Sequence, residues 1–227
     1  MLPFSSAKKL PIFFYGKVKF SKLKNAKIII NAPLIRGMVG FGQPYEMNKA
    51  YSGLSEINIS GTIIFNGYCQ FGKDYFLYVS KDAICEFGNM SSIASRGKII
   101  CSKSIELGDY ARLGSECQII DTNFHDMIDT KYGKLYSKYN PIKIGSYNFI
   151  SNRVSIMKGS ITPDYCTIAS NTLCNKDFSN LGNNVLIGGV PAKLLKDNIS
   201  RDWKGEENKL LKSLQLDKKF NLTVLVY

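Results

Sequence analysis

The apolar positions in the carboxy-terminal half of the chain recur every six residues. Read in sixes from residue 144, the segments are IGSYNF, ISNRVS, IMKGSI, TPDYCT, IASNTL and CNKDFS. A spacing of six is neither the period of an α-helix nor the simple alternation of a β-strand. Six residues suffice for one short strand and one corner, and three such units close a triangular coil. The pattern therefore predicts a parallel β-solenoid, in which each coil buries its aliphatic positions on its neighbours.

The same period runs through earlier parts of the chain, with short slips in frame. The repeating apolar positions there are Ile57, Ile63, Cys69, Phe87, Ile93, Ile99, Ile105, Leu107, Leu113 and Ile119. Several units carry glycine at the second position, which the crowded backbone of a corner favours. These glycines are Gly72, Gly88, Gly108, Gly114 and Gly145. Small insertions at corners account for the slips, so one solenoid domain is expected over 57–192.

One long interruption separates Ile119 from Ile144. The unit IIDTNF completes a regular stretch, and HDMIDTKYGKLYSKYNPIK follows before the period resumes. The wall of a solenoid cannot accommodate so many extra residues, so we expect a protruding loop over 125–141. His125, the only histidine of the chain, stands at the root of this loop.

The two ends of the chain depart from the repeat. Residues 1–56 contain strand-like pieces without clean hexads, and we interpret them as an irregular β-rich cap. Residues 193–227 are expected to form a helix, which would close an open end of the solenoid, and then a short strand. The helix is predicted from the spacing of the apolar residues Trp203, Leu210, Leu211 and Leu214.

Composition narrows the class of protein. The chain has 227 residues, of which 44% are hydrophobic, and no apolar stretch approaches the roughly 20 residues that span a bilayer. The first residues lack the cleavage site of a signal peptide, so we expect a cytoplasmic protein. The six cysteines form no CxxC pair and are interpreted as buried, reduced thiols. A zinc site built on three histidines is excluded, and no metal is expected.

The net charge of +12 is compatible with several anionic partners. Nucleic acid, an anionic membrane surface and a phosphorylated small molecule are the candidates. The lysines are scattered without a basic stripe interleaved with aromatic residues, and no nucleic-acid motif is present. We therefore expect no nucleic-acid partner. Peripheral contact with an anionic membrane or a lipid-linked substrate is retained as an expectation.

Three sequence features resemble the hexapeptide-repeat acyltransferases, and in particular their sugar and polysaccharide O-acetyltransferase branch. They are LGDYARLGSECQIIDTNFH, IKIGSYNFISNRVSIMKGSITPDYCTIASNTLCNKDF and GGVPAKLLK, which together cover roughly 107–196. The resemblance implies an all-β, left-handed parallel β-helix. It also implies a homotrimer that binds acetyl-CoA in the groove between neighbouring prisms, where the active sites lie between subunits.

The resemblance assigns catalytic roles around the single histidine. His125 corresponds to a general base, and an imidazole with an ordinary pKa near ~6.5 can accept a proton from a sugar hydroxyl at neutral pH. The hydroxyl would then attack the thioester directly. Asn123 matches a position that contacts the acceptor or the reacting centre. Asp121 or a backbone carbonyl would orient the second ring nitrogen of His125.

Donor-binding residues follow from the same resemblance. The backbone of Ala169 and Ser170 would line the pantetheine arm, and Phe149 would pack on it in place of the usual tryptophan. Ser151, Pro163 and Ala169 stand where glycine is usual, and Val190 replaces the usual asparagine. Ser151 is a further predicted contact with the donor. The resemblance also implies that Asn175 and Lys176 lie near the adenine end and that Lys193 and Lys196 pair with phosphates.

The acceptor itself is not encoded in these motifs. The leading hypothesis is acetyl transfer from acetyl-CoA to a saccharide hydroxyl, on a cell-surface precursor of capsular or lipopolysaccharide type. N-acetylation of an amino sugar, nucleotide-linked or free, is an alternative. A non-catalytic solenoid that binds or scaffolds other molecules is a second alternative.

Overall fold

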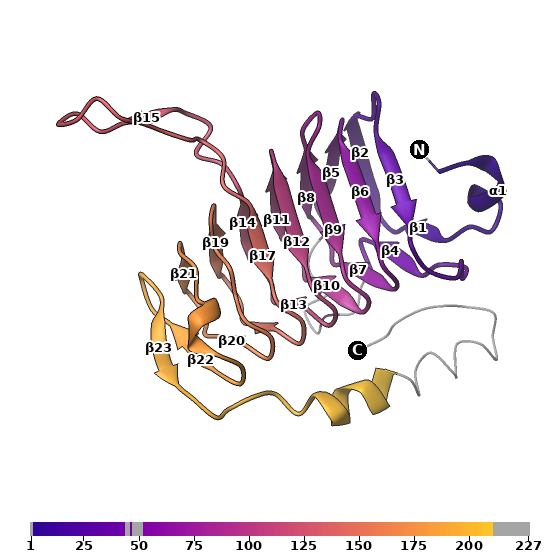
Figure 1. The fold of residues 1–227 in the computed structure, drawn as a ribbon. Helices are drawn as coiled ribbons and strands as arrows, with labels where there is room; N and C mark the ends of the chain where they lie inside the picture. The colour runs from indigo at the N-terminus through magenta and orange to yellow at the C-terminus, as the bar shows by residue number, and fades with distance from the viewer. Residues whose placement is uncertain (1, 44–45, 47–51, 211–227) are drawn as a thin grey trace.

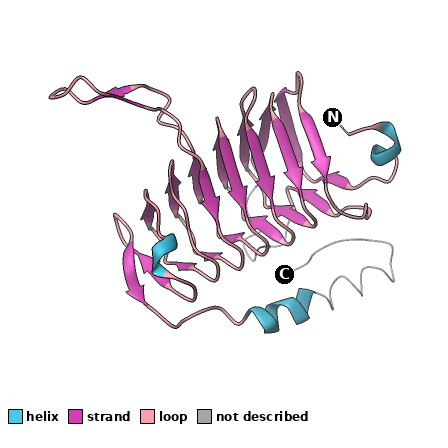
Figure 2. Ribbon diagram, in the orientation of Figure 1, coloured by secondary structure: helices cyan, strands magenta, loops and turns pink. Residues whose placement is uncertain are grey.

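Three parallel sheets wrap around one core and form a triangular prism (Figures 1 and 2). The computed structural model describes residues 2–43, 46 and 52–210. Sheet 1 contains β1 (Ile12–Phe14), β4 (Val39–Phe41), β7 (Cys69–Phe71), β10 (Ser91–Ile93), β13 (Arg112–Leu113), β18 (Phe149–Ile150), β20 (Thr167–Ile168), β22 (Leu186–Gly188) and β23 (Lys193–Lys196). Sheet 2 contains β2 (Lys17–Lys22), β5 (Leu54–Ile59), β8 (Phe76–Val79), β11 (Lys98–Cys101), β14 (Gln118–Ile120), β19 (Ser155–Met157) and β21 (Leu173–Cys174). Sheet 3 contains β3 (Lys27–Ile30), β6 (Thr62–Phe65), β9 (Ile84–Phe87), β12 (Ser104–Leu107) and β17 (Ile142–Ile144).

The chain visits the three sheets in turn, and each strand pairs in parallel with the equivalent strand of the next coil. Viewed from the amino-terminal end, the coils turn counter-clockwise as they recede, so the superhelix is left-handed (Figure 1). In the last coils Ile150 pairs with Ile168, eighteen positions further on. Ile99 pairs with Ile119, twenty positions on, because the corners of this coil are longer. The predicted left-handed parallel β-helix is confirmed.

The core is a stack of inward side chains that changes character along the prism. The amino-terminal coils stack aromatic rings, with Phe41 and Phe71 4.3 Å apart and Phe65 and Phe87 5.3 Å apart. The later coils stack aliphatic residues such as Ile156 together with cysteines such as Cys174. All six cysteines are free and buried, as the sequence predicts. Buried and half-buried residues alternate along strands such as β6 and β12, whereas β4, β7 and β10 of sheet 1 are buried at every residue.

The amino-terminal residues join the regular prism. β1, β2 and β3 each pair with a strand of the next coil, in sheets 1, 2 and 3 respectively. The regular helix therefore begins at Ile12, well before the predicted boundary at residue 57. The hexad pattern misses these coils because their strands are unevenly spaced in the sequence: β3 ends at Ile30 and β4 begins at Val39, for example. Only the short helix α1 (Phe4–Ala7) and its flanking residues precede the first coil in the described part of the chain.

The carboxy-terminal segment runs along the side of the prism instead of closing its end. The short 3-10 helix η1 (Ser179–Leu181) leads into the last strands, and β23 pairs antiparallel with β22. The chain then returns beneath sheet 1 toward the amino-terminal end, and residues 203–210 are helical (Figure 1). Trp203 packs edge-on against Tyr147, whose hydroxyl donates a 2.9 Å hydrogen bond to Glu207. The predicted terminal helix is present, whereas the predicted final strand lies outside the described residues.

Candidate active site

A long arm leaves the prism where the sequence predicts a protruding loop. It spans 121–141 between β14 and β17, and its middle is a small antiparallel hairpin of β15 (Met127–Ile128) and β16 (Leu135–Tyr136) (Figures 1 and 2). The hairpin strands are exposed, including the large apolar side chains of Met127, Ile128 and Leu135. An isolated two-stranded hairpin is at best marginally stable in water. These apolar side chains are therefore left uncovered by the described part of this chain.

The root of the arm is fixed by hydrogen bonds to the prism and within the arm itself. Within the arm, the N–H of Asn123 donates to the carbonyl of Lys138 at 2.9 Å. The Lys158 ammonium, on the neighbouring coil, donates to the carbonyl of Ser137 at 2.7 Å. The N–H of Asn140 donates to the carbonyl of Asp121 at 3.1 Å. Hydrogen bonds hold both chain segments of the root, so residues 121–125 have a defined position relative to the prism.

His125 is exposed on this root, at the edge between sheets 2 and 3. The preceding Phe124 has a φ of +63°, and its N–H donates to the Thr122 hydroxyl at 2.9 Å. This turn orients the backbone just before the histidine. Within the described residues, the imidazole makes no hydrogen bond or ion pair. Both ring nitrogens are therefore available to a bound molecule, and Asn123, two residues earlier, is also exposed.

Asp121 is engaged with the neighbouring coil. Its side chain is fully buried, and its two oxygens accept the N–H groups of Ser102, Lys103 and Ser104 at 2.7, 2.7 and 2.9 Å. Burial raises the pKa of this carboxyl above its ordinary value, and the three N–H donors oppose that shift. The carboxylate thus caps the corner between β11 and β12. The structure brings Asp121 and Asn123 to the same root as His125, but the capping contacts occupy both oxygens of Asp121.

The predicted donor-binding residues fall in three separate places. Ser151, Ala169 and Ser170 lie at corners between sheets 1 and 2, directly after β18 and β20. Asn175 and Lys176 follow β21, at the edge between sheets 2 and 3, which is the edge from which the arm leaves. A single chain therefore does not gather these residues around His125.

The third group lies on sheet 1 and its carboxy-terminal strand. Lys193 and Lys196 are exposed on β23. Phe149 faces outward from sheet 1, where the Arg201 guanidinium lies 4.9 Å from its ring centre. Arg201 also pairs with Glu206 at 2.8 Å. The face of Phe149 predicted to pack on pantetheine is thus covered by the returning carboxy-terminal segment, a contact between distant parts of the chain that the hexad pattern does not reveal.

The arm carries a basic and aromatic pattern that the sequence analysis overlooked. Three lysines each lie over the ring of a tyrosine close to them in the chain, with nitrogen-to-centroid distances of 4.9 to 5.8 Å. The pairs are Lys131 with Tyr132, Lys134 with Tyr136, and Lys138 with Tyr139. The segment KYGKLYSKY, residues 131–139, shows this alternation of lysine and tyrosine in the sequence itself. The arm also carries Asp126 and Asp129, so the charge of its three lysines is largely balanced.

Comparisons with known proteins give structural similarities only. A scan against protein-family models finds no match, and a search of curated proteins finds none either. The chain is similar to the polySia-specific acetyltransferase NeuO, with 18% identity and a TM-score of 0.49 over 84% of this chain and 78% of that one. It is also similar to the polysialic acid O-acetyltransferase OatWY, with 17% identity and a TM-score of 0.34 over 83% and 90%.

A third similarity is to a mutant of AntD, an N-acyltransferase from Bacillus cereus solved in complex with dTDP and coenzyme A. Identity is 16% and the TM-score 0.43, over 93% of this chain and 97% of that one. Identities and TM-scores this low give no basis for assigning these activities to the chain. In the described part, no group of three or more His, Cys, Asp or Glu side chains is placed to hold a metal ion. No described helix is long and apolar enough to cross a membrane.

Proposed function

We propose that the protein is an acetyl-CoA-dependent O-acetyltransferase whose acceptor is a saccharide hydroxyl. The observation that carries this proposal is the placement of the single histidine. His125 is exposed, free of partners within the described residues, and mounted on a hydrogen-bonded root at one edge of a triangular β-helix. The sequence motifs that resemble hexapeptide-repeat acyltransferases surround this same residue. Either acceptor needs a base, because an amine arrives protonated at neutral pH and a hydroxyl must lose its proton as it attacks.

The chemistry assigned to the chain's own residues is proton transfer and positioning. The imidazole of His125 accepts the proton of the acceptor hydroxyl as its oxygen attacks the thioester carbonyl carbon. The new carbon–oxygen bond forms, the carbon–sulfur bond breaks, and the imidazolium returns the proton to the departing thiolate. Asn123, two residues before this group, supplies a polar contact to the acceptor. Asp121 acts through the corner it caps, as a positioning residue for the arm.

Donor binding is proposed to involve a second copy of the chain. The corner residues Ala169 and Ser170 lie on a different edge of the prism from His125, so a neighbouring prism must bring the two edges together. A closed trimer does this for all subunits equivalently. The exposed apolar side chains of the arm support the same arrangement, since large unpartnered apolar surfaces mark interaction sites. Exposed Lys193 and Lys196 would pair with donor phosphates.

The proposed trimer is tested by measuring the molecular mass of the protein in solution. Light scattering is expected to give three times the chain mass of 25.4 kDa for the unmodified protein. A variant with Met127→Lys and Leu135→Lys is expected to have a lower mass, because two ammonium groups would be buried in the contact. Lys substitutions at Phe14 and Leu54, which are exposed apolar residues away from the arm, serve as the control. A monomeric unmodified protein would contradict the inter-subunit site.

The activity is tested by product chemistry. Purified protein, acetyl-CoA and a panel of neutral, acidic and lipid-linked saccharides are expected to yield free CoA and an acetylated sugar. The product should lose its acetyl group in hydroxylamine, as esters do. A hydroxylamine-stable product would show an amide and favour an amino-sugar acceptor. Absence of turnover across the panel, with saccharide binding retained, would favour a non-catalytic solenoid.

A further inference from the structure

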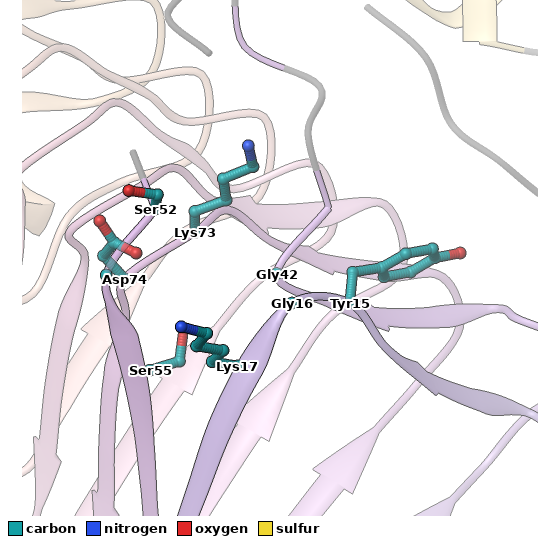
Figure 3. Close-up of a pocket in the computed structure, with 9 residues that line it drawn as sticks. Tyr15, Gly16, Lys17, Gly42, Ser52, Ser55, Lys73 and Asp74 are labelled. Atoms are coloured by element: carbon teal, nitrogen blue, oxygen red, sulfur yellow. The ribbon is translucent and has the colours of Figure 1, made fainter. Parts of the chain in front are cut away.

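A cavity of about 400 Å³ opens at the edge between sheets 1 and 2 in the first three coils (Figure 3). This volume lies within the roughly 300–1,000 Å³ typical of small-molecule sites. Its walls come from three consecutive corners, those before β2, before β5 and before β8. The side chains that line it are Tyr15, Lys17, Ser52, Ser55, Lys73 and Asp74. None of these residues belongs to the arm or to the predicted donor site.

Glycine backbone forms part of the cavity wall. Gly42 has a φ of +82°, and a Cβ there would lie 2.3 Å from the carbonyl oxygen of Tyr15, so no side chain fits. Gly16 has a φ of +75° and open space where a side chain would be. Glycine at residue 42 is therefore required by the chain's own close packing against Tyr15, whereas the space beside Gly16 is open.

The polar groups around the cavity are of mixed charge. Figure 3 shows Ser52, Lys73 and Asp74 on one side and Tyr15 on the other, with the two glycines between them. Among the residues the structure describes, no carboxylate lies within 4.0 Å of the ammonium groups of Lys17 or Lys73. The Lys17 ammonium lies beside Ser55, whereas the Lys73 side chain points away from it and the Tyr15 ring points away from the other lining residues (Figure 3). An ammonium group can pair with an anion, and a carboxylate and serine hydroxyls can hydrogen-bond sugar hydroxyls.

We infer that this cavity binds one acidic sugar residue, a pyranose bearing a carboxylate or a phosphate, of an extended oligosaccharide acceptor. The inference rests on the proposed function and adds to it a second contact with the acceptor, remote from the reacting hydroxyl.

The geometry of sheet 2 sets the length of that acceptor. The cavity lies where β5 and β8 begin, and the arm leaves where β14 ends. From β5 to β14 the sheet advances three strands, or roughly 14 Å, and the strands themselves run about 13–16 Å. The cavity and the arm root of one chain are therefore roughly 20 Å apart. A monosaccharide cannot reach both, so the cavity contributes only when the acceptor is several sugars long.

Calorimetric titration of the full chain with three probes tests this site. The probes are a carboxylated galacturonate oligomer, a phosphorylated mannose oligomer and a neutral maltose oligomer of matched length. The carboxylated or the phosphorylated oligomer is expected to bind at least tenfold more tightly than the neutral one, and which of the two binds identifies the anionic group. A double variant, Lys17→Ala with Lys73→Ala, is expected to lose at least tenfold in affinity for that oligomer.

A matched variant removes the same charge elsewhere. Lys24→Ala with Lys81→Ala takes two exposed lysines from corners at the opposite edge of sheet 2 and should change the affinity less than twofold. Lys73→Glu provides a second test, because it reverses the charge at this position without truncating the side chain to a methyl group. Equal losses in the two double variants, equal binding of neutral and acidic oligomers, or no binding of any oligomer would overturn the site.

The outcome is distinguishable from failure of the proposed function. Binding is measured without acetyl-CoA and can be repeated in a variant that lacks His125. Tight, lysine-dependent binding without acetyl transfer would refute the enzyme and keep the saccharide site. Acetyl transfer that ignores Lys17 and Lys73 at every acceptor length would keep the enzyme and refute the site.

Discussion

Replacing His125 with alanine is expected to lower kcat for acetyl transfer by between a hundredfold and ten-thousandfold, the usual contribution of a positioned general base. The free energy of unfolding should hardly change. His125 is exposed and makes no hydrogen bond within the described residues, and surface substitutions of this kind typically alter stability by less than about 0.5 kcal/mol. Release of free CoA, followed with a thiol reagent at saturating acceptor, measures the first quantity. Urea denaturation measures the second.

The neighbouring Asp126 supplies the matched control. It is also exposed and lies on the same stretch of arm, so Asp126→Ala should leave kcat within about twofold. A pH series adds a readout specific to a base, because the pH profile of log kcat/KM should differ between the unmodified enzyme and the alanine variant. Unchanged turnover in His125→Ala would place the base elsewhere. Equal losses in both variants would point to damage of the arm.

The repeating part of the fold was predictable because one interaction dominates it. Each inward aliphatic or cysteine side chain packs on its equivalents one coil away, so burial imposes the same residue type at a fixed spacing. Ile150 and Ile168, or Ile156 and Cys174, are adjacent in a sheet because they are one coil apart in the sequence. The protruding arm was predictable for the converse reason. Residues that break the spacing cannot enter the wall.

The amino-terminal coils could not be predicted in this way, because their core residues and the lengths of their corners differ from those of the later coils. Phe41, Phe65, Phe71 and Phe87 fill that part of the prism. Phe41 pairs with Phe71, thirty positions on, and Phe65 pairs with Phe87, twenty-two positions on, so the spacing between equivalent residues is not constant. The cavity at Lys17 and Lys73 forms where the corners before β2, β5 and β8 meet in space, and no local sequence motif predicts it.

The candidate site was predictable in part. The root of the arm follows from the break in period, and it places Asn123 and His125 together. The course of the carboxy-terminal segment does not follow from any repeat, since it is set by side chains far apart in the chain. Arg201 over Phe149 and Glu207 on Tyr147 are examples. In the proposed trimer, the distance between His125 and the corner at Ala169 depends on contacts between subunits. The periodicity of inward-facing residues carries no information about those contacts.

Asp121 illustrates how a residue beside a reactive group can serve the fold. Several corners of the prism use the same device, in which a side chain of one coil accepts backbone N–H groups of the coil before it. Asp109 accepts the N–H of Asn89 at 2.7 Å, and Asp164 accepts that of Ser146 at 2.7 Å. Those carboxylates are exposed and each accepts one bond, whereas Asp121 is buried and accepts three. Its contribution to stability should therefore be the larger.

Substituting Asp121 with alanine is expected to lower the free energy of unfolding by about 3 kcal/mol, since buried N–H groups lose a charged acceptor. Asp109→Ala, at an exposed corner with a single bond, should cost about 1 kcal/mol or less. Urea denaturation of both variants measures the difference. Asp121→Asn keeps the shape and one carbonyl acceptor, so it should fall between them and retain most of the turnover. If Asp121→Asn instead lost turnover at least a hundredfold while matching the unmodified protein in stability, the carboxylate would be acting on His125 directly, and its role at the corner would be secondary.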